Sequence, residues 1–540
     1  MPESDVGVPT ADLDIGRPAD PPTRPRSDRV ADVVFAVAAV AASVAIVALN
    51  RRQWFFHDDF VFAFERDVTD PVSLLRPHFG HNTVLPSVVF QAMYQVLGLR
   101  VFWPYQVLVI ASHVAVATLL RAVMLRCRVD QLLATSAAIL FLFYGSGREN
   151  LTWAFQTTLN GSIAFGFAAL LVADHDGPPD RRDLHAALLL CASVLCSNLG
   201  PFMAGGGAVA GDVGPGPRAV GRGGGGPPAP LRLWRLTAPT GREARDTATP
   251  DEAWVWGSEL LAYGFRSLTH VPVLTAALAG SVLVALVLFG RRVSREGLRS
   301  DDAVPVAVVV GLAGVVAILG VSRGGGVYPP FTPRYAYMVA VFSLPTVAWS
   351  LSRLAAGRRR WVVAASALLL LGLPANVGRI GPSNEYDEMY LGAPELVAAL
   401  GQEASARNTT PGYEVYGLAT SDGLIDAYRR GEIPDVAISP EVRARAALFV
   451  SLGAARSPSH SCRTVDHTEP LTLERGDRLE VDSEKVGVTL LSVPGEPSDS
   501  GSVPDTDGIR GFDVLVDQIE LLVRPETSGT DVRVCRSDRS

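Results

Sequence analysis

The chain has 540 residues, of which 48% are hydrophobic and only 19% are charged, and its formal net charge is -7 at pH 7. A soluble globular chain carries about 25% charged residues, so this composition argues against an ordinary soluble protein. The negative charge argues against nucleic acid as a partner, because such a partner requires a surplus of basic side chains. High Ala, Gly, Val and Arg with little Lys indicates a GC-rich genome, typical of actinobacteria.

The N-terminal residues 1–29 are rich in Pro, Asp and Arg and lack apolar periodicity, which predicts a disordered tail. Arginines then precede an apolar run over 30–49. A membrane span needs about 20 apolar residues, and this run has no clear small-x-small cleavage site. It therefore predicts a retained signal-anchor helix instead of a cleaved signal peptide.

Eight further apolar runs predict membrane spans, and arginines cluster in alternate loops between them. By the positive-inside rule the tail is cytoplasmic, and the loops 50–104, 145–160 and 321–334 lie outside. Everything after about residue 376 lies outside as well, in a multi-pass protein of the inner (plasma) membrane. The eight runs are 105–124, 131–144, 161–172, 184–202, 271–289, 303–320, 335–352 and 361–373.

An anomalous stretch occupies 203–250, and its first part is dominated by Gly and Pro, which neither form a helix nor bury a core. It is either a flexible exported loop or a local reading-frame error that replaced a pair of spans. The frame error is the favoured interpretation. Because losing a pair of spans preserves the side of every later loop, the topology does not discriminate between these two. The span count is nine as written and eleven in an intact relative.

The C-terminal segment 385–540 is polar and acidic. Helical spacing in its first part gives way to short alternating apolar runs separated by Gly, Pro and Asp, which predicts a mainly β domain outside the cytoplasm. Cys462 and Cys535 lie in this segment, where an exported location would permit a disulfide between them. The other three cysteines lie in or beside apolar runs and are expected to act as small hydrophobic side chains.

The first outside loop carries the most informative pattern, RRQWFFHDDFVFAFERD, in which Asp58 and Asp59 follow the first span among aromatic residues. Burial beside apolar side chains raises a carboxyl pKa, which is how a general base or acid is tuned. The alternative is that Asp58 only caps a helix that starts there. Later in the same loop, His78 and His81 are either metal ligands or solvated interfacial histidines.

Two other outside loops are short and polar. One contains Arg148 and Glu149, and the other contains Arg334 and Tyr335. Arginines there would hold a phosphate through charge-assisted hydrogen bonds, or else anchor the interface together with aromatic side chains. The spans themselves contain essentially no Asp, Glu or Lys, and His113 is their main ionisable side chain. Ion-coupled transporters usually carry such groups at depth, so the pattern favours chemistry at the membrane surface.

The motif HDDF in the first outside loop resembles the C-type (GT-C) integral membrane glycosyltransferases. The stretch LRPHFGHNTVLPSVVFQAMYQVLGL, the loop ENLTWAFQ and the late PRYAY are similar to actinobacterial proteins related to the protein mannosyltransferase and aminoarabinose transferase group. The resemblance covers about residues 30–380 and leaves out the C-terminal domain. The 203–230 stretch departs from it, since relatives have spans there.

The resemblance implies an α-helical polytopic fold of about 9 to 11 spans and transfer of a sugar from a polyprenyl-phosphate donor to a cell-envelope acceptor. It implies that Asp58 or Asp59 is the general base and that Arg334, with Arg148 second, binds the donor phosphate. Some members use a divalent metal, which leaves a role for His78 and His81. No other cofactor is implied.

Three hypotheses follow from the sequence. The favoured one is an enzyme, a polyprenyl-phosphate-sugar-dependent glycosyltransferase of the hexosyltransferase type. The second is a transporter or flippase of a lipid-linked envelope intermediate. The third is a non-catalytic membrane scaffold whose exported domain binds a partner.

Overall fold

The structure of the chain is a computed structural model. It describes residues 26–56, 58–78, 81–175, 180–197, 199, 248–325, 329–381, 385–407, 414–415, 419–454, 462–465, 468–481, 486–492, 501–503, 511–514, 518–525 and 532–535. Most of the predicted tail and most of the anomalous 203–250 stretch lie outside these ranges.

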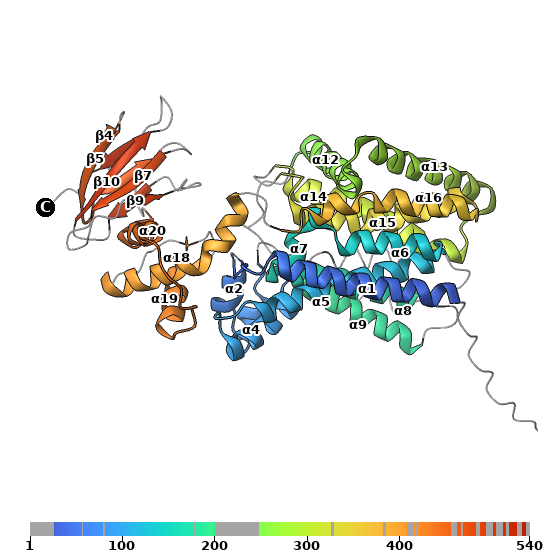
Figure 1. Cartoon of the computed structure of the whole chain (residues 1–540), viewed down its shortest axis with the longest axis horizontal. Helices are drawn as coiled ribbons and strands as arrows, with labels where there is room; N and C mark the ends of the chain where they lie inside the picture. The colour runs from blue at the N-terminus through green and yellow to red at the C-terminus, as the bar shows by residue number, and fades with distance from the viewer. Residues whose placement is uncertain are drawn as a thin grey trace, which may run out of the picture.

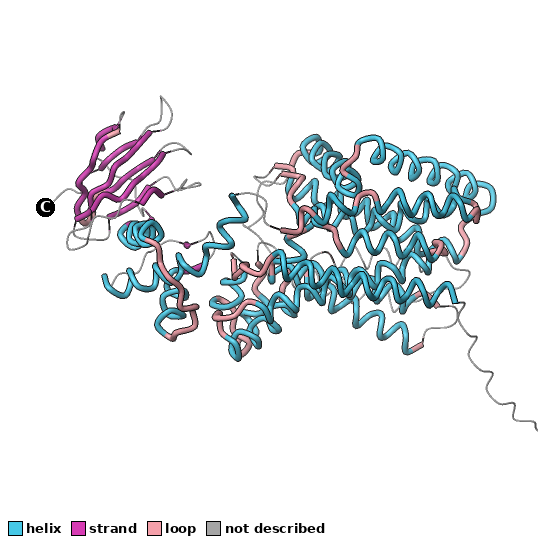
Figure 2. The backbone as a smooth tube through the Cα atoms, viewed as in Figure 1, coloured by secondary structure: helices cyan, strands magenta, loops and turns pink. Residues whose placement is uncertain are grey.

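A bundle of long helices forms the larger part of the molecule (Figure 1). Its helices lie side by side along the long axis, and Figure 2 shows that this part is almost entirely helical. The helices are α1 (Arg26–Leu49), α5 (Trp103–Arg126), α6 (Gln131–Leu142), α8 (Thr157–Ala173), α9 (Arg181–Cys196), α12 (Pro250–Thr269), α13 (Pro272–Glu296), α14 (Ala303–Arg323), α15 (Pro333–Ala355) and α16 (Arg359–Leu370).

Seven helical segments of the described chain are long and apolar enough to cross a membrane, by length and composition. They coincide with seven of the nine predicted runs, which confirms the α-helical polytopic fold. The other two runs, 131–144 and 184–202, correspond to α6 with 12 residues and α9 with 16. The first helix begins at Arg26, so residues 26–29 belong to α1 and not to the predicted tail.

The bundle has a buried centre and an apolar exterior. In α15, 78% of the residues in the most apolar stretch are buried, whereas the figure is 17% in α1 and in α13. Both outer helices expose valine or leucine side chains along most of their length. Because exposed apolar side chains are stable in lipid and costly in water, α1 and α13 are the lipid-facing helices and α15 is the core.

Helix α12 was not predicted. It begins at Thr249, whose side chain forms a capping box with Glu252, and ends at His270, which has a φ of +57°. The helix packs a buried face, including Trp256 and Leu260, against α14 and α15. Charged residues on its other face lowered its hydropathy below that of a span. Pro250, the last residue of the anomalous stretch, is also the first residue of this helix.

One end of the bundle carries the short elements between spans, and we call it the site end. It holds α2 (Asp58–Phe64), α3 (Pro71–Leu75), α4 (Val84–Leu97) and α7 (Glu149–Thr152), together with the turns η1 (Gly145–Gly147) and η2 (Ala154–Gln156). The helix α17 (Leu373–Val377) packs against η1 and α12. At the cytoplasmic end predicted from the arginines, η3 (Ser300–Asp302) precedes α14.

The C-terminal part begins with helices and ends with strands. The helices are α18 (Glu385–Arg407), α19 (Ser421–Arg429) and α20 (Pro440–Ser451), with the short pair β1 (Glu414–Val415) and β2 (Ala419–Thr420) between α18 and α19. Apolar side chains of these helices, among them Leu396 and Leu424, share one buried cluster with Phe60 of α2 and Phe90 of α4. The helical part therefore packs on the loop that carries the acidic pair.

Two antiparallel sheets follow, with strand orders β5-β10-β7-β8 and β3-β9-β6-β11-β4. Cys462 on β4 and Cys535 on β11 are directly opposed in register and are joined by a disulfide. The strands are β3 (Leu452–Ala454), β4 (Cys462–Val465), β5 (Glu469–Glu474), β6 (Arg478–Val481), β7 (Val486–Ser492), β8 (Gly501–Val503), β9 (Gly511–Val514), β10 (Gln518–Pro525) and β11 (Val532–Cys535).

Candidate functional site

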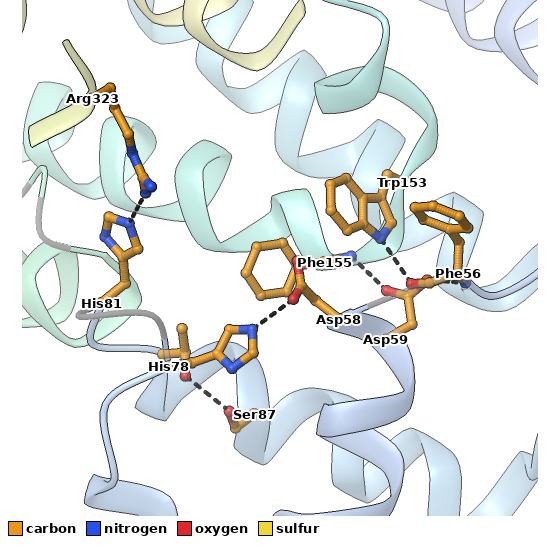
Figure 3. A network of polar contacts seen from close by, with 10 residues as sticks. Phe56, Asp58, Asp59, His78, His81, Ser87, Trp153, Phe155 and Arg323 are labelled. Carbon is orange, nitrogen blue, oxygen red and sulfur yellow. Dashed lines mark hydrogen bonds and ion pairs between the residues drawn. The ribbon is translucent and has the colours of Figure 1, made fainter. Parts of the chain in front are cut away.

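The acidic pair lies at the first turn of α2, and both aspartates are buried. An acidic residue in the first turn of a helix interacts favourably with the helix dipole, so the HDDF sequence is compatible with a helix start. The two side chains nevertheless point in different directions, Asp58 toward His78 and Asp59 toward Phe56 and Phe155 (Figure 3). His57 lies outside the described residues.

Asp59 holds two loops together. Its Oδ2 accepts a hydrogen bond from the backbone N–H of Phe56 at 3.0 Å, and its Oδ1 accepts one from the N–H of Phe155 at 2.9 Å. The side chain is fully buried, and burial raises its pKa well above the usual value, an effect opposed by the two amide donors and reinforced by Asp58. The indole N–H of Trp153 also donates to the Phe56 carbonyl at 3.2 Å. Asp59 thus fastens the first outside loop to the 145–160 loop.

Asp58 has a different partner. Its Oδ1 lies 2.7 Å from Nε2 of His78, and both side chains are about nine-tenths buried. An imidazole at this distance either donates a proton to a carboxylate or accepts one from a carboxylic acid. The pair is therefore a carboxyl–imidazole dyad that can take up and pass on a proton, whereas both oxygens of Asp59 are already bound to backbone amides.

His81 exchanges backbone hydrogen bonds of 2.9 and 2.8 Å with His78. Its Nε2 accepts a hydrogen bond from the guanidinium of Arg323, at the end of α14, at 3.3 Å. Burial, together with the nearby charge of Arg323, lowers the pKa of His81 to about 4. His81 is thus neutral at pH 7. Because its Nε2 already faces a cation, this nitrogen of His81 is poorly placed as a metal ligand.

Arg334 and Glu149 form an ion pair of 2.9 Å between the start of α15 and α7. Their side chains are 18% and 10% exposed, so the pair is largely shielded from solvent. The guanidinium of Arg334 also lies over the ring of Tyr335, 5.2 Å from its centroid. Tyr335 in turn contacts Trp256 of α12 edge to face. Glu149 therefore positions Arg334, and the ring of Tyr335 packs against its guanidinium.

Arg148 belongs to a second cationic group, which the sequence did not reveal. Arg148, Arg266 and Arg379 all act electrostatically on Tyr263 of α12. Burial first, and then Arg379 and Arg266, lower the pKa of the neighbouring His270. Arg266 lies over the ring of Tyr263 at 5.4 Å. Neither Arg266 nor Arg379 stood in a recognisable motif, since each lies at a helix end that only the fold brings close to Arg148.

The structure thus brings together residues from three predicted outside loops. Asp58 and His78 come from the first loop, Glu149 from the second and Arg334 from the third. The charges of Asp58, Arg323 and Arg334 all influence the pKa of His81. The arrangement offers a proton acceptor beside a cluster of arginines, which is what transfer of a group away from a phosphate requires.

A metal ion at this site has less support than the proton acceptor and the arginine cluster. A metal site of the usual kind needs three or four ligand atoms around one point. Within the described residues, the three-ligand grouping of His, Asp and Glu side chains that could hold an ion lies elsewhere, between α8 and α9. His78 is bonded to Asp58 and His81 to Arg323.

Comparisons with known proteins give one distant likeness. No protein-family model matches the sequence, and no curated protein matches it significantly. The crystal structure of ArnT from Cupriavidus metallidurans bound to undecaprenyl phosphate is similar, with a TM-score of 0.42 and 12% sequence identity over 74% of this chain and 85% of that chain. A likeness at this level does not assign a function, so the site stands on its own geometry.

Proposed function

We propose that the chain is a membrane glycosyltransferase that transfers a sugar from a polyprenyl-phosphate donor to an acceptor at the outer surface of the inner membrane. The observation that carries this proposal is the Asp58–His78 dyad beside the cationic groups of Arg323 and Arg334. The arrangement lies at an end of an apolar bundle, where a lipid phosphate would meet the protein.

Asp58 is the proposed general base. The acceptor hydroxyl oxygen attacks the anomeric carbon of the sugar, the bond from that carbon to the phosphate oxygen breaks, and the hydroxyl proton passes to Asp58. His78 orients the carboxylate, because its Nε2 lies 2.7 Å from Oδ1 of Asp58. General base catalysis of this kind contributes about 10²–10⁴-fold to a rate.

The arginines are the proposed binding groups for the departing polyprenyl phosphate. As the sugar–phosphate bond breaks, negative charge grows on the phosphate oxygens, and nearby guanidinium groups stabilise that charge. Arg334 is held in place by Glu149 and Tyr335. Arg148, Arg266 and Arg379 extend the cationic surface toward α12 and α17. A polyprenyl chain would lie in lipid against the bundle, with its phosphate at this level.

The location of ionisable groups favours an enzyme over the transporter hypothesis. The site residues gather at the site end, whereas in the spans His113 is bonded to the Tyr337 hydroxyl at 2.9 Å and lies 3.2 Å from the Leu142 carbonyl. Such a satisfied, fully buried histidine is a structural contact between helices. The scaffold hypothesis does not explain why Asp58 and His78 are buried, since burying charged groups has a free-energy cost.

Replacing the proposed base tests the assignment. Asp58→Asn should abolish transfer of a labelled sugar from a polyprenyl-phosphate donor in isolated membranes, with normal expression and insertion. Asp70→Asn is the matched control, because Asp70 is an exposed aspartate of the same loop that caps α3 and Asn is an equally good cap. Full transfer by Asp58→Asn would make the catalytic assignment wrong. Donor movement across the membrane without a new glycosidic bond would support the transporter instead.

A further inference from the structure

A histidine and two aspartates converge at the opposite end of the bundle, between α8 and α9. His175 follows the end of α8, Asp180 is the N-cap of α9, and Asp183 lies in its first turn. Nε2 of His175 is 3.7 Å from Oδ1 of Asp180 and 3.3 Å from Oδ2 of Asp183. None of these residues takes part in the proposed transfer.

Nε2 of His175 is a buried atom without a hydrogen bond within the described residues. The side chain of His175 is 10% exposed, and its Nε2 has no hydrogen-bond partner in the described part of the chain, although it points between two carboxylates. A buried imidazole nitrogen without a hydrogen bond is costly. Either an ion pair without hydrogen-bond geometry or a bound cation would account for this position.

The spacing fits a shared metal ion. One ligand atom from each residue lies within 4.8 Å of the other two. For bonds of about 2.1 Å in a tetrahedral site, neighbouring ligand atoms are about 3.4 Å apart, close to the observed 3.3 and 3.7 Å.

The carboxylates are oriented by backbone donors. The N–H of Arg182 donates to Asp180 Oδ1 at 2.7 Å, and the N–H of Asp180 donates to Asp183 Oδ2 at 2.7 Å. Such outer contacts fix the direction of ligands in metal sites. The neighbouring Asp174 is engaged by Arg126, which leaves the charges of Asp180 and Asp183 to balance a cation.

We propose that His175, Asp180 and Asp183 form a binding site for a divalent transition-metal ion that joins the end of α8 to the start of α9. An imidazole with two carboxylates suits Zn²⁺ or Mn²⁺ better than Mg²⁺, which prefers oxygen ligands and retains its water. The ion links the end of one helix to the first turn of the next. Its role is structural, and it lies apart from the Asp58 site.

Metal titration of the purified full-length protein tests the site. The protein is stripped with a chelator in detergent and titrated with ZnCl₂, with MgCl₂ as the comparison. The wild type should bind one Zn²⁺ that His175→Gln and Asp183→Asn lose, and its apparent melting temperature should rise by several degrees with Zn²⁺ and not with Mg²⁺. His185→Gln is the matched control, since His185 is an exposed histidine of α9 and should keep the Zn²⁺.

The variants also separate loss of the site from loss of the fold. In chelator, His175→Gln and Asp183→Asn should melt at the wild-type temperature, because Gln and Asn retain the size of the side chain and Asn still accepts the capping hydrogen bond. If His175→Gln melts lower than the wild type in chelator, the comparison is made with Asp180→Asn. Equal uptake of Zn²⁺ by the wild type and these variants would overturn the proposal, as would a melting temperature that Zn²⁺ does not change.

Discussion

The two aspartates of the acidic pair should respond in opposite ways to the same substitution. Asn has nearly the shape of Asp but offers one oxygen and an NH₂ group in place of two oxygens. At Asp59 the two oxygens accept from the N–H groups of Phe56 and Phe155 at 3.0 and 2.9 Å. Asp59→Asn therefore leaves one of those amides facing a donor in a fully buried place.

The expected cost follows from that mismatch. An unsatisfied buried donor costs about 1–3 kcal/mol, and a lost hydrogen bond to a charged group about 1.5–3 kcal/mol. Because the ionised form of Asp59 is itself disfavoured by burial, part of that loss is offset, and we expect Asp59→Asn to destabilise by about 2–3 kcal/mol. Asp58→Asn should change stability by less than about 1 kcal/mol, because Asn can still hydrogen-bond to the imidazole of His78.

The two substitutions should affect activity in the reverse order, with the larger loss for Asp58→Asn. Asp58→Asn should lower sugar transfer by about 10²–10⁴-fold, the usual contribution of a general base. Asp59→Asn should keep a measurable rate below its lowered melting temperature. Thermal melting in detergent and a labelled-sugar transfer assay read the two effects separately. A wild-type melting temperature for Asp59→Asn, or a lower stability for Asp58→Asn than for Asp59→Asn, would contradict these two roles.

The pH dependence of stability gives an independent check on Asp59. Its pKa is raised in the folded protein, chiefly by burial, so above its unfolded pKa of about 3.9 the folded state binds more protons than the unfolded state. The wild type should therefore lose stability as the pH rises from about 4 toward the folded pKa. Asp59→Asn lacks this loss, so the gap between the two melting temperatures should narrow with rising pH. A gap that widens would contradict the assignment.

Four further substitutions test three other contacts. Arg334→Gln should reduce transfer by about 10²-fold, as loss of one charge-stabilising donor does. Glu149→Gln should reduce transfer less. Equal rates for Arg334→Gln and the wild type would argue against a phosphate-binding role of Arg334. Cys462→Ser removes the bond to Cys535 and should cost about 2–5 kcal/mol, seen as lower protease resistance of the C-terminal domain, with no change expected in transfer. Gly372→Ala places a methyl group against a backbone carbonyl of α12 and should cost about 1–3 kcal/mol by overpacking, measurable as a lower melting temperature.

The helical bundle could be predicted because lipid imposes a strong and local constraint. A span must be long and apolar, and that shows in any window of about 20 residues. Helix α12 escaped this test because it is amphipathic, with Trp256 and Leu260 buried and Asp251 and Glu252 at its start. Its capping box, with Thr249 and Glu252, was nonetheless a readable start signal.

The candidate site was only partly predictable. The sequence indicated which residues lie in the outside loops, since the positions of Asp58, His78, Glu149 and Arg334 relative to the spans are local information. It did not indicate that Asp59 is a structural clamp or that Glu149 pairs with Arg334. These contacts join residues far apart in the chain, such as the 185 positions between Glu149 and Arg334, and only packing of the bundle determines them.

The pairing partners of the histidines illustrate the same limit. Two histidines three residues apart suggested a metal, but the fold gives His78 to Asp58 and His81 to Arg323. At the other end of the bundle, His175 approaches two aspartates that the sequence had not singled out. Spacing along the chain thus predicts metal ligands less well than the direction in which the fold points each side chain.

The proposed function assigns sugar transfer from a lipid phosphate to the site end. The most direct measurement uses the purified protein in lipid with a polyprenyl-phosphate sugar and an acceptor alcohol, and quantifies both products. Under the proposed function, glycosylated acceptor and free polyprenyl phosphate should form in equal amounts with the wild type and with Asp70→Asn, but not with Asp58→Asn. Equal product from the wild type and Asp58→Asn, or donor crossing the bilayer intact without product, would contradict it.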